Sequence, residues 1–181
     1  MRHPKELSLT SATLEDAEAI AEIVRSSYSN EPPSRVPADM PIYHADYHAE
    51  AMRDPTTRWR LMCDTAGPVG IVMWRMLPEL AHLHLLFVRA DRQGRGYGSL
   101  LLKHFEESAC DEQPNTKLLT LHCLACSTKA LRFYRRHGYH QYEPGMEGRQ
   151  PELYLWIDAS RREDTAWPLK KDKLLFFKLT R

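Results

Sequence analysis

Apolar positions along the chain follow helical spacing in some segments and strand spacing in others. Residues 17–24 carry apolar side chains at helical intervals, and Thr13 stands before them as a candidate cap. We expect this helix to end near Tyr28. The proline-rich residues 30–41 exclude a regular element, and a shorter helix is expected at residues 45–52.

The middle of the chain predicts a series of strands. Residues 58–63 and 68–77 have the pattern of two strands joined by a turn at residues 64–67, and residues 81–88 form a third. Residues 117–124 are typical of a buried strand. Together these patterns predict a sheet built from segments far apart in the sequence.

The second half of the chain adds helices and shorter strands. A glycine-rich segment at residues 91–98 leads into a helix through residues 100–105, and a later helix at residues 128–137 is closed by Gly138. Three strand patterns remain, at residues 139–142, 152–157 and 173–179, the last two joined by the polar residues 158–164. Alternating strands and helices predict one α/β (α+β) sheet domain over residues 1–181.

Composition narrows the class of protein. The 181 residues are 43% hydrophobic and 27% charged, as in a globular protein. Lys+Arg 25 against Asp+Glu 24 leaves a net charge of +1, which argues against nucleic acid or an anionic membrane as the main partner. The absence of a long apolar run and of a signal-peptide core, with four cysteines that suit reduced thiols, leads us to expect a cytoplasmic protein.

The glycine-rich segment is the strongest candidate for a binding site. Glycines allow positive φ angles and let a ligand approach the backbone closely, while a helix N-terminus adds unpaired N–H donors, so the segment suits a phosphate group. Gly94, Gly96 and Gly98 alternate, which matches neither the dinucleotide fingerprint nor a Walker loop. The alternative is a tight strand–helix turn that binds nothing.

Two segments resemble the GNAT superfamily of acyl-CoA-dependent N-acyltransferases. Gln93, Gly96 and Gly98 match its pyrophosphate-loop signature, Gln/Arg-x-x-Gly-x-Gly/Ala. Thirty residues on, the run with Phe133-Tyr134 and then Gly138-Tyr139 resembles the superfamily's second segment. There a helix contacts coenzyme A and a tyrosine protonates the departing thiolate; the resemblance assigns this role to Tyr134. Ser127 stands where the superfamily often has asparagine.

The resemblance extends to one branch, the arylalkylamine N-acetyltransferases. Ala81-His82-Leu83-His84 is similar to a strand of those enzymes that carries two histidines, proposed to help deprotonate the amine, and Cys126 also fits. Alternate residues of a strand face one way, so His82 and His84 can serve one channel. They can also be ordinary packed strand residues. The resemblance covers about residues 69–142.

The resemblance implies a fold and a function. The fold is a single-domain GNAT-type mixed sheet of six or seven strands, with helices on both faces, splayed where cofactor and acceptor meet. The expected activity is direct transfer of an acetyl group from acetyl-CoA, as cosubstrate, to a primary amine, with a small arylalkylamine as partner and no nucleic acid, membrane or metal. A protein or peptide acceptor, and a CoA-binding regulatory domain without turnover, stay open as alternatives.

The same resemblance also implies which residues form the site. The predicted catalytic residues are Tyr134, His82 and His84. The predicted cofactor-binding residues lie at the end of the third strand, in the glycine loop and before the later helix: Leu86, Phe87, Val88, Gln93, Gly94, Arg95, Gly96, Tyr97, Gly98, Ser99 and Ser127.

Two further clusters and one aromatic group complete the expectations. Cys123 and Cys126 lack a second cysteine pair for zinc and are expected to be buried thiols. His44 and His48 lack the glutamate of a metalloprotease motif and are expected to be exposed or to line a pocket. Aromatic residues expected to border the acceptor site are Tyr28, Tyr43, Tyr47 and Trp74.

Overall fold

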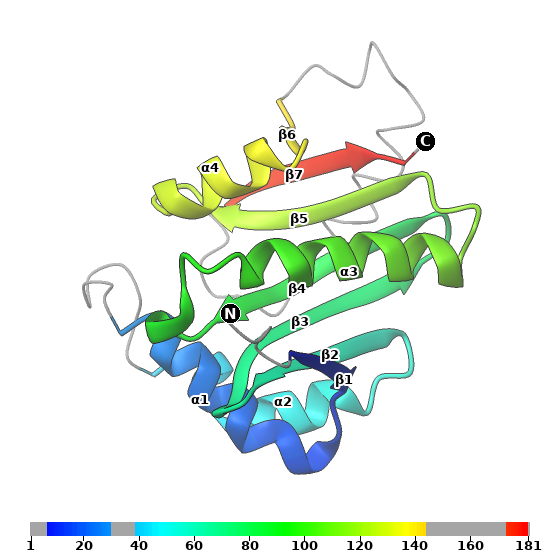
Figure 1. Cartoon of the computed structure of the whole chain (residues 1–181). Coiled ribbons are helices and arrows are strands. Elements are labelled where there is room, and N and C mark those ends of the chain that lie inside the picture. Colours follow the sequence, from blue (N-terminus) through cyan, green and yellow to red (C-terminus); the bar gives the residue numbers. More distant parts are fainter. Residues whose placement is uncertain (1–6, 30–38, 144–172, 181) are drawn as a thin grey trace, which may run out of the picture. The chain divides into compact units, whose positions relative to one another are not determined.

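The computed structural model of the chain describes residues 7–29, 39–143 and 173–180. Within these ranges seven strands form one sheet in the order β1-β2-β3-β4-β5-β7-β6 (Figure 1). Strands β4 and β5 are parallel, whereas β1–β2, β2–β3, β5–β7 and β6–β7 are antiparallel. The predicted mixed α/β sheet is therefore confirmed. None of the helices in the described ranges combines the length and apolar character that a membrane crossing requires.

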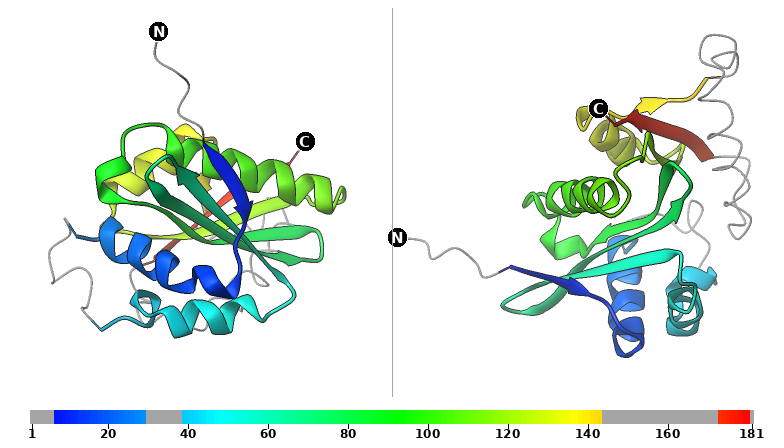
Figure 2. Two further views of the ribbon diagram at one scale, coloured as in Figure 1. Left: turned by 60° about the horizontal axis from the view of Figure 1, so that its bottom comes forward. Right: turned by 90° about the vertical axis from the view of Figure 1, so that its right-hand side faces the viewer.

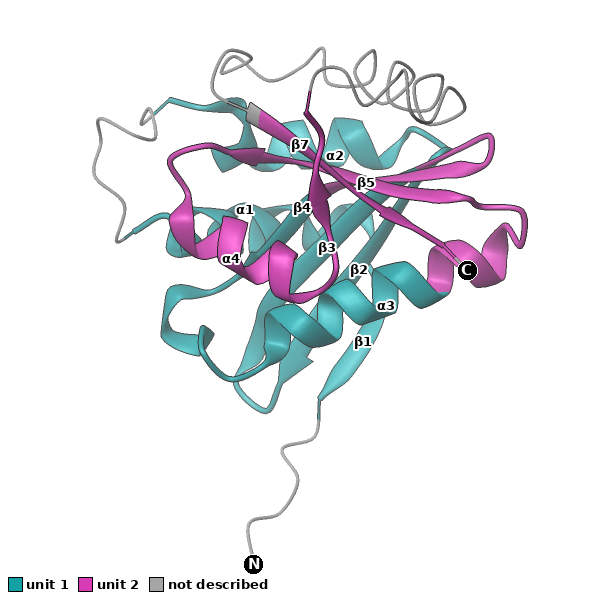
Figure 3. Cartoon of the chain, turned by 90° about the horizontal axis from the view of Figure 1, so that it is seen from above, with its two compact units in different colours: residues 1–75, 85–107 teal, residues 76–84, 108–181 magenta. Residues whose placement is uncertain are grey.

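The chain divides into two compact units (Figure 3). Unit 1 comprises Met1–Arg75 and Leu85–Glu107, and unit 2 comprises Met76–His84 and Ser108–Arg181. Strands β3 and β4 each contribute to both units, because the chain passes from one unit to the other within them.

Unit 1 holds the N-terminal elements and the glycine loop. Its strands and helices, including those it shares with unit 2, are β1 (Ser8–Ser11), α1 (Ala17–Ser27), α2 (Ala45–Met52), β2 (Thr57–Asp64), β3 (Gly67–Leu77), β4 (Leu80–Val88) and α3 (Tyr97–Glu112). Three short 3₁₀ turns lie between them: η1 (Leu14–Asp16), η2 (Pro41–Tyr43) and η3 (Ala90–Arg92). The predicted helix at residues 45–52 and the strands of the central region are confirmed, with ends that differ by at most one residue.

The first helix begins differently from its prediction. Thr13 caps the 3₁₀ turn η1, where the Asp16 carboxylate accepts the Thr13 N–H at 2.7 Å, and the α-helix starts only at Ala17. The helix ends at Ser27, next to the expected Tyr28. The capping residue was thus read correctly, but it caps a tighter turn that precedes the helix.

The central part of β3 is buried on both faces of the sheet in unit 1. Gly70 allows α3 to approach, because a Cβ there would lie 2.9 Å from Leu101 Cδ1. Trp74 faces the same way, with its ring 5.6 Å from that of Phe105. Figure 2 shows α1 and α2 on one side of the unit 1 strands and α3 on the other. Trp74 has no exposed surface, so the expectation that it borders an acceptor site is wrong: alternation along β3 turns it under α3.

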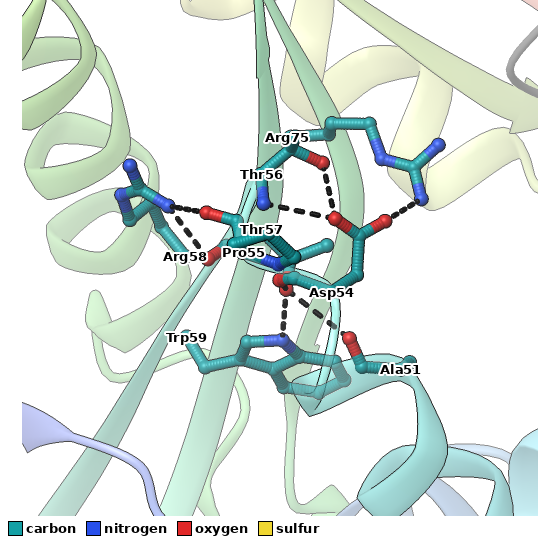
Figure 4. A network of polar contacts seen from close by, with 8 residues as sticks. All are labelled: Ala51, Asp54, Pro55, Thr56, Thr57, Arg58, Trp59 and Arg75. Carbon is teal, nitrogen blue, oxygen red and sulfur yellow. Dashed lines mark hydrogen bonds and ion pairs between the residues drawn. The ribbon is translucent and has the colours of Figure 1, made fainter.

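A polar network ties the end of α2 to the sheet of unit 1 (Figure 4). The Asp54 carboxylate accepts hydrogen bonds from the Thr56 amide at 2.9 Å and the Thr56 hydroxyl at 2.6 Å, and it pairs with the Arg75 guanidinium at 2.7 Å. These Thr56 hydrogen bonds, and then the charge of Arg75, hold the pKa of the Asp54 carboxyl below its usual range. The carboxylate thereby fixes the approach of α2 to the start of β2.

The Thr57 hydroxyl extends this network to the core. It accepts a hydrogen bond from Trp59 Nε1 at 3.0 Å, and it has the carbonyl oxygens of Asp54 and Ala51 as acceptors at 2.8 and 3.2 Å. Thr57 also pairs with Arg75 across the β2–β3 hairpin. The predicted turn of that hairpin is confirmed, with Asp64 opposite Gly67.

Unit 2 is built around β5. Besides its parts of β3, β4 and α3, it contains β5 (Leu118–Leu124), α4 (Thr128–Arg136), β6 (His140–Gln141) and β7 (Lys173–Leu179). Gly138 follows α4 with φ +84°, which confirms the predicted left-handed cap. The predicted strand at residues 139–142 is shorter than expected, the one at residues 173–179 is confirmed, and residues 152–164 lie outside the described part of the chain.

We predict that Asp54→Asn lowers the free energy of unfolding by about 1–2 kcal/mol at pH 7, because the variant loses a charge-assisted hydrogen bond to Arg75. The native carboxyl has a pKa below its value in the unfolded chain, about 3.9. Its stabilisation is therefore complete above pH 4 and is lost as the pH falls through the native pKa. Urea denaturation at pH 7 and pH 3 measures the difference.

Asp111→Asn is the matched control, because Asp111 is exposed in the last turn of α3. We expect it to change stability by less than about 0.5 kcal/mol at either pH. An equal loss in both variants at pH 7 would contradict a specific role of the Asp54 network.

Candidate functional site

The parallel pairing of β4 with β5 ends before either strand does. The register runs from Leu80 opposite Leu118 to Leu83 opposite Leu121, whereas β4 continues to Val88 and β5 to Leu124. From His84 onward, the β4 backbone in this described stretch has no partner on β5. The sequence resemblance predicts that two strands part where cofactor and acceptor meet, and the end of this register is the candidate position.

Three histidines of unit 2 cluster where the pairing ends. His82 and His84 share one face of β4, with ring centroids 4.7 Å apart. His122, on β5, has its Nδ1 3.3 Å from Nε2 of His82. The other ring nitrogen of His82, Nδ1, is 2.7 Å from the Thr120 hydroxyl. His82 is therefore hydrogen bonded through both nitrogens.

The three rings differ in exposure. His82 is only 2% exposed, while His84 and His122 are half-buried. A ring as buried as His82 acts on a ligand through its neighbours, whereas His84 and His122 keep accessible surface.

Sequence reasoning found His82 and His84 but missed His122. The signal was present: Thr120-x-His122 repeats on β5 the alternation of His82-x-His84 on β4. What the sequence does not show is the parallel register that sets His82 opposite Thr120. Because partners in adjacent strands face the same side of a sheet, this register brings the two pairs together.

Tyr134 lies on α4, also within unit 2. It is 9% exposed, and its ring makes edge contacts with those of Phe133 at 5.2 Å and Tyr139 at 5.9 Å. The Arg135 guanidinium lies 5.9 Å from the centre of the Phe176 ring. Helix α4 therefore packs on the side of β7 to which Phe176 points. Figure 1 shows α4 next to β7.

The histidines lie on the other side of the same strands. Thr120 is opposite Phe177 in the β5–β7 register, and His122 is opposite Leu175. Phe177 and Phe176 are successive residues of β7 and point to opposite faces. The structure thus sets the predicted acid, Tyr134, and the predicted bases on opposite faces of unit 2.

The glycine loop belongs to unit 1 and is held by three contacts. Gln93 donates its side-chain amide to the Val88 carbonyl at 3.1 Å, Arg92 pairs with Asp64 at 2.9 Å, and the Ala90 amide donates to the Ser26 hydroxyl at 3.2 Å. The hydrogen bond to Asp64 is the main cause that raises the pKa of the Arg92 guanidinium. These contacts fix the loop between the end of β4 and α3.

The backbone of this loop is open on one side. Gly94 and Gly96 have φ angles of +75° and +86°, and a Cβ added at either would meet no atom within 4 Å. Gly98 lies in the first turn of α3. The predicted use of glycine is confirmed for the conformation of Gly94 and Gly96.

Other predicted cofactor residues occupy varied surroundings. Tyr97 is buried, whereas Arg95 is exposed. Val88 is buried, whereas Leu86, Phe87 and Ser99 in unit 1 and Ser127, the N-cap of α4 in unit 2, are half-buried. The role of each in binding a cofactor stays a prediction.

Two sequence expectations outside the site need correction. His48 is fully buried rather than exposed or pocket-lining: its Nε2–H donates to the Ile42 carbonyl at 2.8 Å, and burial lowers its pKa. Cys123 is buried as expected, and burial raises the pKa of its thiol to about 12, but Cys126 is exposed. The burial of His48 and the exposure of Cys126 follow from their local positions. His48 faces inward from α2, and Cys126 lies in the turn after β5.

Among the described residues no group of three or more His, Cys, Asp or Glu could hold a metal ion.

A family model for the acetyltransferase (GNAT) family matches residues 17–139. The chain belongs to this family. The match includes the glycine loop, the three histidines and Tyr134, so the predicted GNAT acyltransferase class is confirmed.

Individual relatives agree with this assignment. The uncharacterized N-acetyltransferase YjcF of Bacillus subtilis (strain 168) is 30% identical over 76 residues, or 42% of this chain and 51% of YjcF. The chain thus matches about half the length of this curated relative.

Solved structures share the fold. The PaiA N-acetyltransferase from Thermoplasma acidophilum, in complex with coenzyme A, has a TM-score of 0.70 at 12% identity, covering 97% of this chain and 99% of that one. The ribosomal-protein-S18-alanine N-acetyltransferase from Escherichia coli has a TM-score of 0.67 at 13% identity, covering 96% and 94%.

Proposed function

We propose that this GNAT-family chain transfers the acetyl group of acetyl-CoA directly to a primary amine. The observation that carries the proposal is the arrangement in unit 2. The histidines lie on one face, at the end of the β4–β5 pairing, and Tyr134 belongs to the helix on the opposite face. Aminolysis of a thioester needs a base for the amine and an acid for the thiolate. An arrangement of this kind lets the two approach the reacting carbon from different sides.

The histidine cluster supplies the base. An alkylammonium has a pKa of about 10.4, so its deprotonation at pH 7 costs about 4–5 kcal/mol. Histidine, with an ordinary pKa near 6.5, is suited to accept that proton. We assign the acceptor role to His84, directly or through a water, because it is half-buried whereas His82 is only 2% exposed.

The glycine loop supports the binding of the cosubstrate. Its open backbone at Gly94 and Gly96 suits the pyrophosphate of coenzyme A, which the N–H groups at the start of α3 can bind. The β4 backbone after Leu83 is free of β5, and its N–H groups near Leu86–Val88 can bind the thioester carbonyl as negative charge develops on it. The PaiA structure, solved with coenzyme A, belongs to a protein of the same fold.

Tyr134 completes the reaction as the acid. The neutral amine attacks the thioester carbon, the C–S bond breaks, and the sulfur leaves with its electron pair. A phenol with a pKa near 10 is protonated at neutral pH and can give its proton to that thiolate. The products are the N-acetyl amide and free coenzyme A. The histidine proton passes to solvent, and the second proton that the attacking nitrogen loses balances the one that Tyr134 gives to the thiolate, so the phenol is restored.

We further propose that the acceptor is a small aromatic or amphipathic amine. Tyr28 makes edge contacts with Phe87 at 5.4 Å and with Tyr43 at 6.0 Å, and all three rings are half-buried in unit 1. Such rings can stack on an aromatic acceptor or hold its ammonium by cation–π contact. The ring of Tyr47 packs on His48, with centroids 5.4 Å apart. The His82-x-His84 similarity to arylalkylamine N-acetyltransferases favours the same class.

The acceptor class is tested by comparing amines under one set of conditions. We expect kcat/KM with tryptamine or phenethylamine to exceed that with spermidine or a short peptide by about tenfold or more, as buried stacking and cation–π contacts of about 1–2 kcal/mol predict. Higher kcat/KM for the peptide would replace the small-amine proposal by a protein acceptor. Binding of coenzyme A without turnover of any amine would favour the regulatory alternative.

Gly98→Ala tests the phosphate loop without straining the backbone. Alanine favours a helix by about 1 kcal/mol over glycine, so the variant should be at least as stable as the native chain. We expect its affinity for coenzyme A in calorimetry to fall about tenfold or more, a loss of about 1.4 kcal/mol, because the Cβ keeps the pyrophosphate from the N–H groups. Lys103→Ala, which removes an exposed cation farther along α3, should bind within about twofold of the native chain. Equal affinities for Gly98→Ala and the native chain would refute the loop assignment.

Tyr134→Phe tests the acid. We expect kcat to fall about 10²–10⁴-fold while the affinity for coenzyme A stays within a few fold, because only the transition state uses the hydroxyl. Tyr139→Phe is the matched control, since it removes a hydroxyl from the neighbouring ring on the same face. A loss of kcat that is the same in both variants would mark Tyr134 as a packing residue.

A further inference from the structure

A hydrogen-bonded chain of three side chains runs through the face of unit 2 that carries the histidines. The Thr120 hydroxyl lies 2.7 Å from Nδ1 of His82, and Nε2 of His82 lies 3.3 Å from Nδ1 of His122. Thr120 has no exposed surface and His82 has 2%. The His82 ring, in the middle of these three side chains, therefore has a protein hydrogen-bond partner at each of its two nitrogens.

The bonding capacity of the three groups restricts where protons can be. A neutral imidazole has one N–H and one lone pair, whereas a protonated ring has two N–H donors. When His82 takes up a proton, the Thr120 oxygen can accept one of its N–H groups and the Nδ1 lone pair of His122 the other. His122 can do this only if it is neutral with its own proton on Nε2. Without that acceptor, the charged ring would keep a buried donor unsatisfied.

We infer that His122 is a positioning residue that selects the tautomer of His82 and stabilises its protonated form. The half-buried His84 then meets the amine, its ring centroid lies 4.7 Å from that of His82, and His122 stabilises the charge whenever a proton is on His82. This inference rests on the proposed function for the role of the base. It goes beyond the two-histidine pattern because His122 comes from another strand.

The neighbours of the pair include other titratable groups. In the described part of unit 2, titratable side chains on the same face include His84 on β4, the exposed His140 opposite Phe177 on β6, and Tyr142 just after β6. The remaining neighbours toward the start of β4 form an apolar cluster: Leu77, Leu80, Leu118, Leu175 and Phe177. Two protonated rings whose facing nitrogens lie 3.3 Å apart would repel each other, so the His82–His122 pair holds one added proton at a time.

The test compares two substitutions of His122. His122→Leu removes the acceptor, while His122→Asn keeps a carbonyl oxygen close to the position of Nδ1 but cannot be protonated. His140→Asn is the matched control on the same face. For each, the pH profile of kcat/KM is measured with the best amine of the panel described above.

We expect His122→Leu to lower kcat about tenfold and to move the acid limb of the profile about one unit lower, because the protonated form of His82 loses its acceptor. His122→Asn should restore kcat to within about threefold of the native chain, and His140→Asn should leave the profile unchanged. A native profile in His122→Leu, or equal impairment of His122→Asn and His122→Leu, would overturn the inference.

A second readout does not depend on turnover. The ¹⁵N shifts of labelled histidine rings report tautomer and protonation in the chain without substrate. We expect His122 to carry its proton on Nε2, and the titration midpoint of the His82 ring to fall by about one unit in His122→Leu. An unchanged midpoint would overturn the inference even if acetyl transfer is confirmed. Absence of acetyl transfer in the native chain would overturn the proposed function instead, and the NMR result would still decide the role of His122.

Discussion

The pairing between β4 and β5 is the constraint on which the candidate site depends. Two parallel strands hydrogen bond through Leu83 and Leu121 and then continue without each other. A strand backbone needs partners for its N–H and C=O groups, so an edge that opens inside a sheet is suited to a ligand with peptide-like groups. The histidines gather at this position because both strands place them within one residue of the last pair, Leu83 with Leu121. In the function that we propose, the end of this register is therefore where the chemistry occurs.

Strand alternation then decides how the chemistry is divided. Successive residues of β7 point to opposite faces, and the register carries this division across β5 to β4. One face receives the histidines and an apolar cluster, whereas α4 with Tyr134 covers the other. A base and an acid within hydrogen-bonding distance of each other would exchange their proton directly. Separation by the thickness of a sheet keeps the two roles apart in the mechanism that we propose.

Unit 1 contributes rigidity around a loop that must keep its backbone exposed. The loop itself has little packing of its own, because Gly94 and Gly96 have no side chains and open space beside them. Its position comes from side chains on either side, of which Arg92 with Asp64 and Gln93 with the Val88 carbonyl are the clearest. The Asp54 network provides similar bracing between α2 and the β2–β3 hairpin. Buried and half-buried polar contacts thus fix the glycine loop and the segment between α2 and β2.

The sequence by itself determined the order of the elements, the glycine conformations at Gly96 and Gly138, and the family, because these depend on local pattern and short motifs. Tertiary structure decided which strands are neighbours and in what register. Only that register reveals His122, since its partner His82 is 40 residues away in sequence. The burial of Trp74 and His48 could likewise not be predicted from the sequence, because an aromatic or imidazole ring is found both in cores and in pockets. Trp74 is buried because α3 packs on its face of β3, and His48 because η2 packs against α2. Local periodicity specifies which residues share a face, but the packing of distant segments specifies what that face meets.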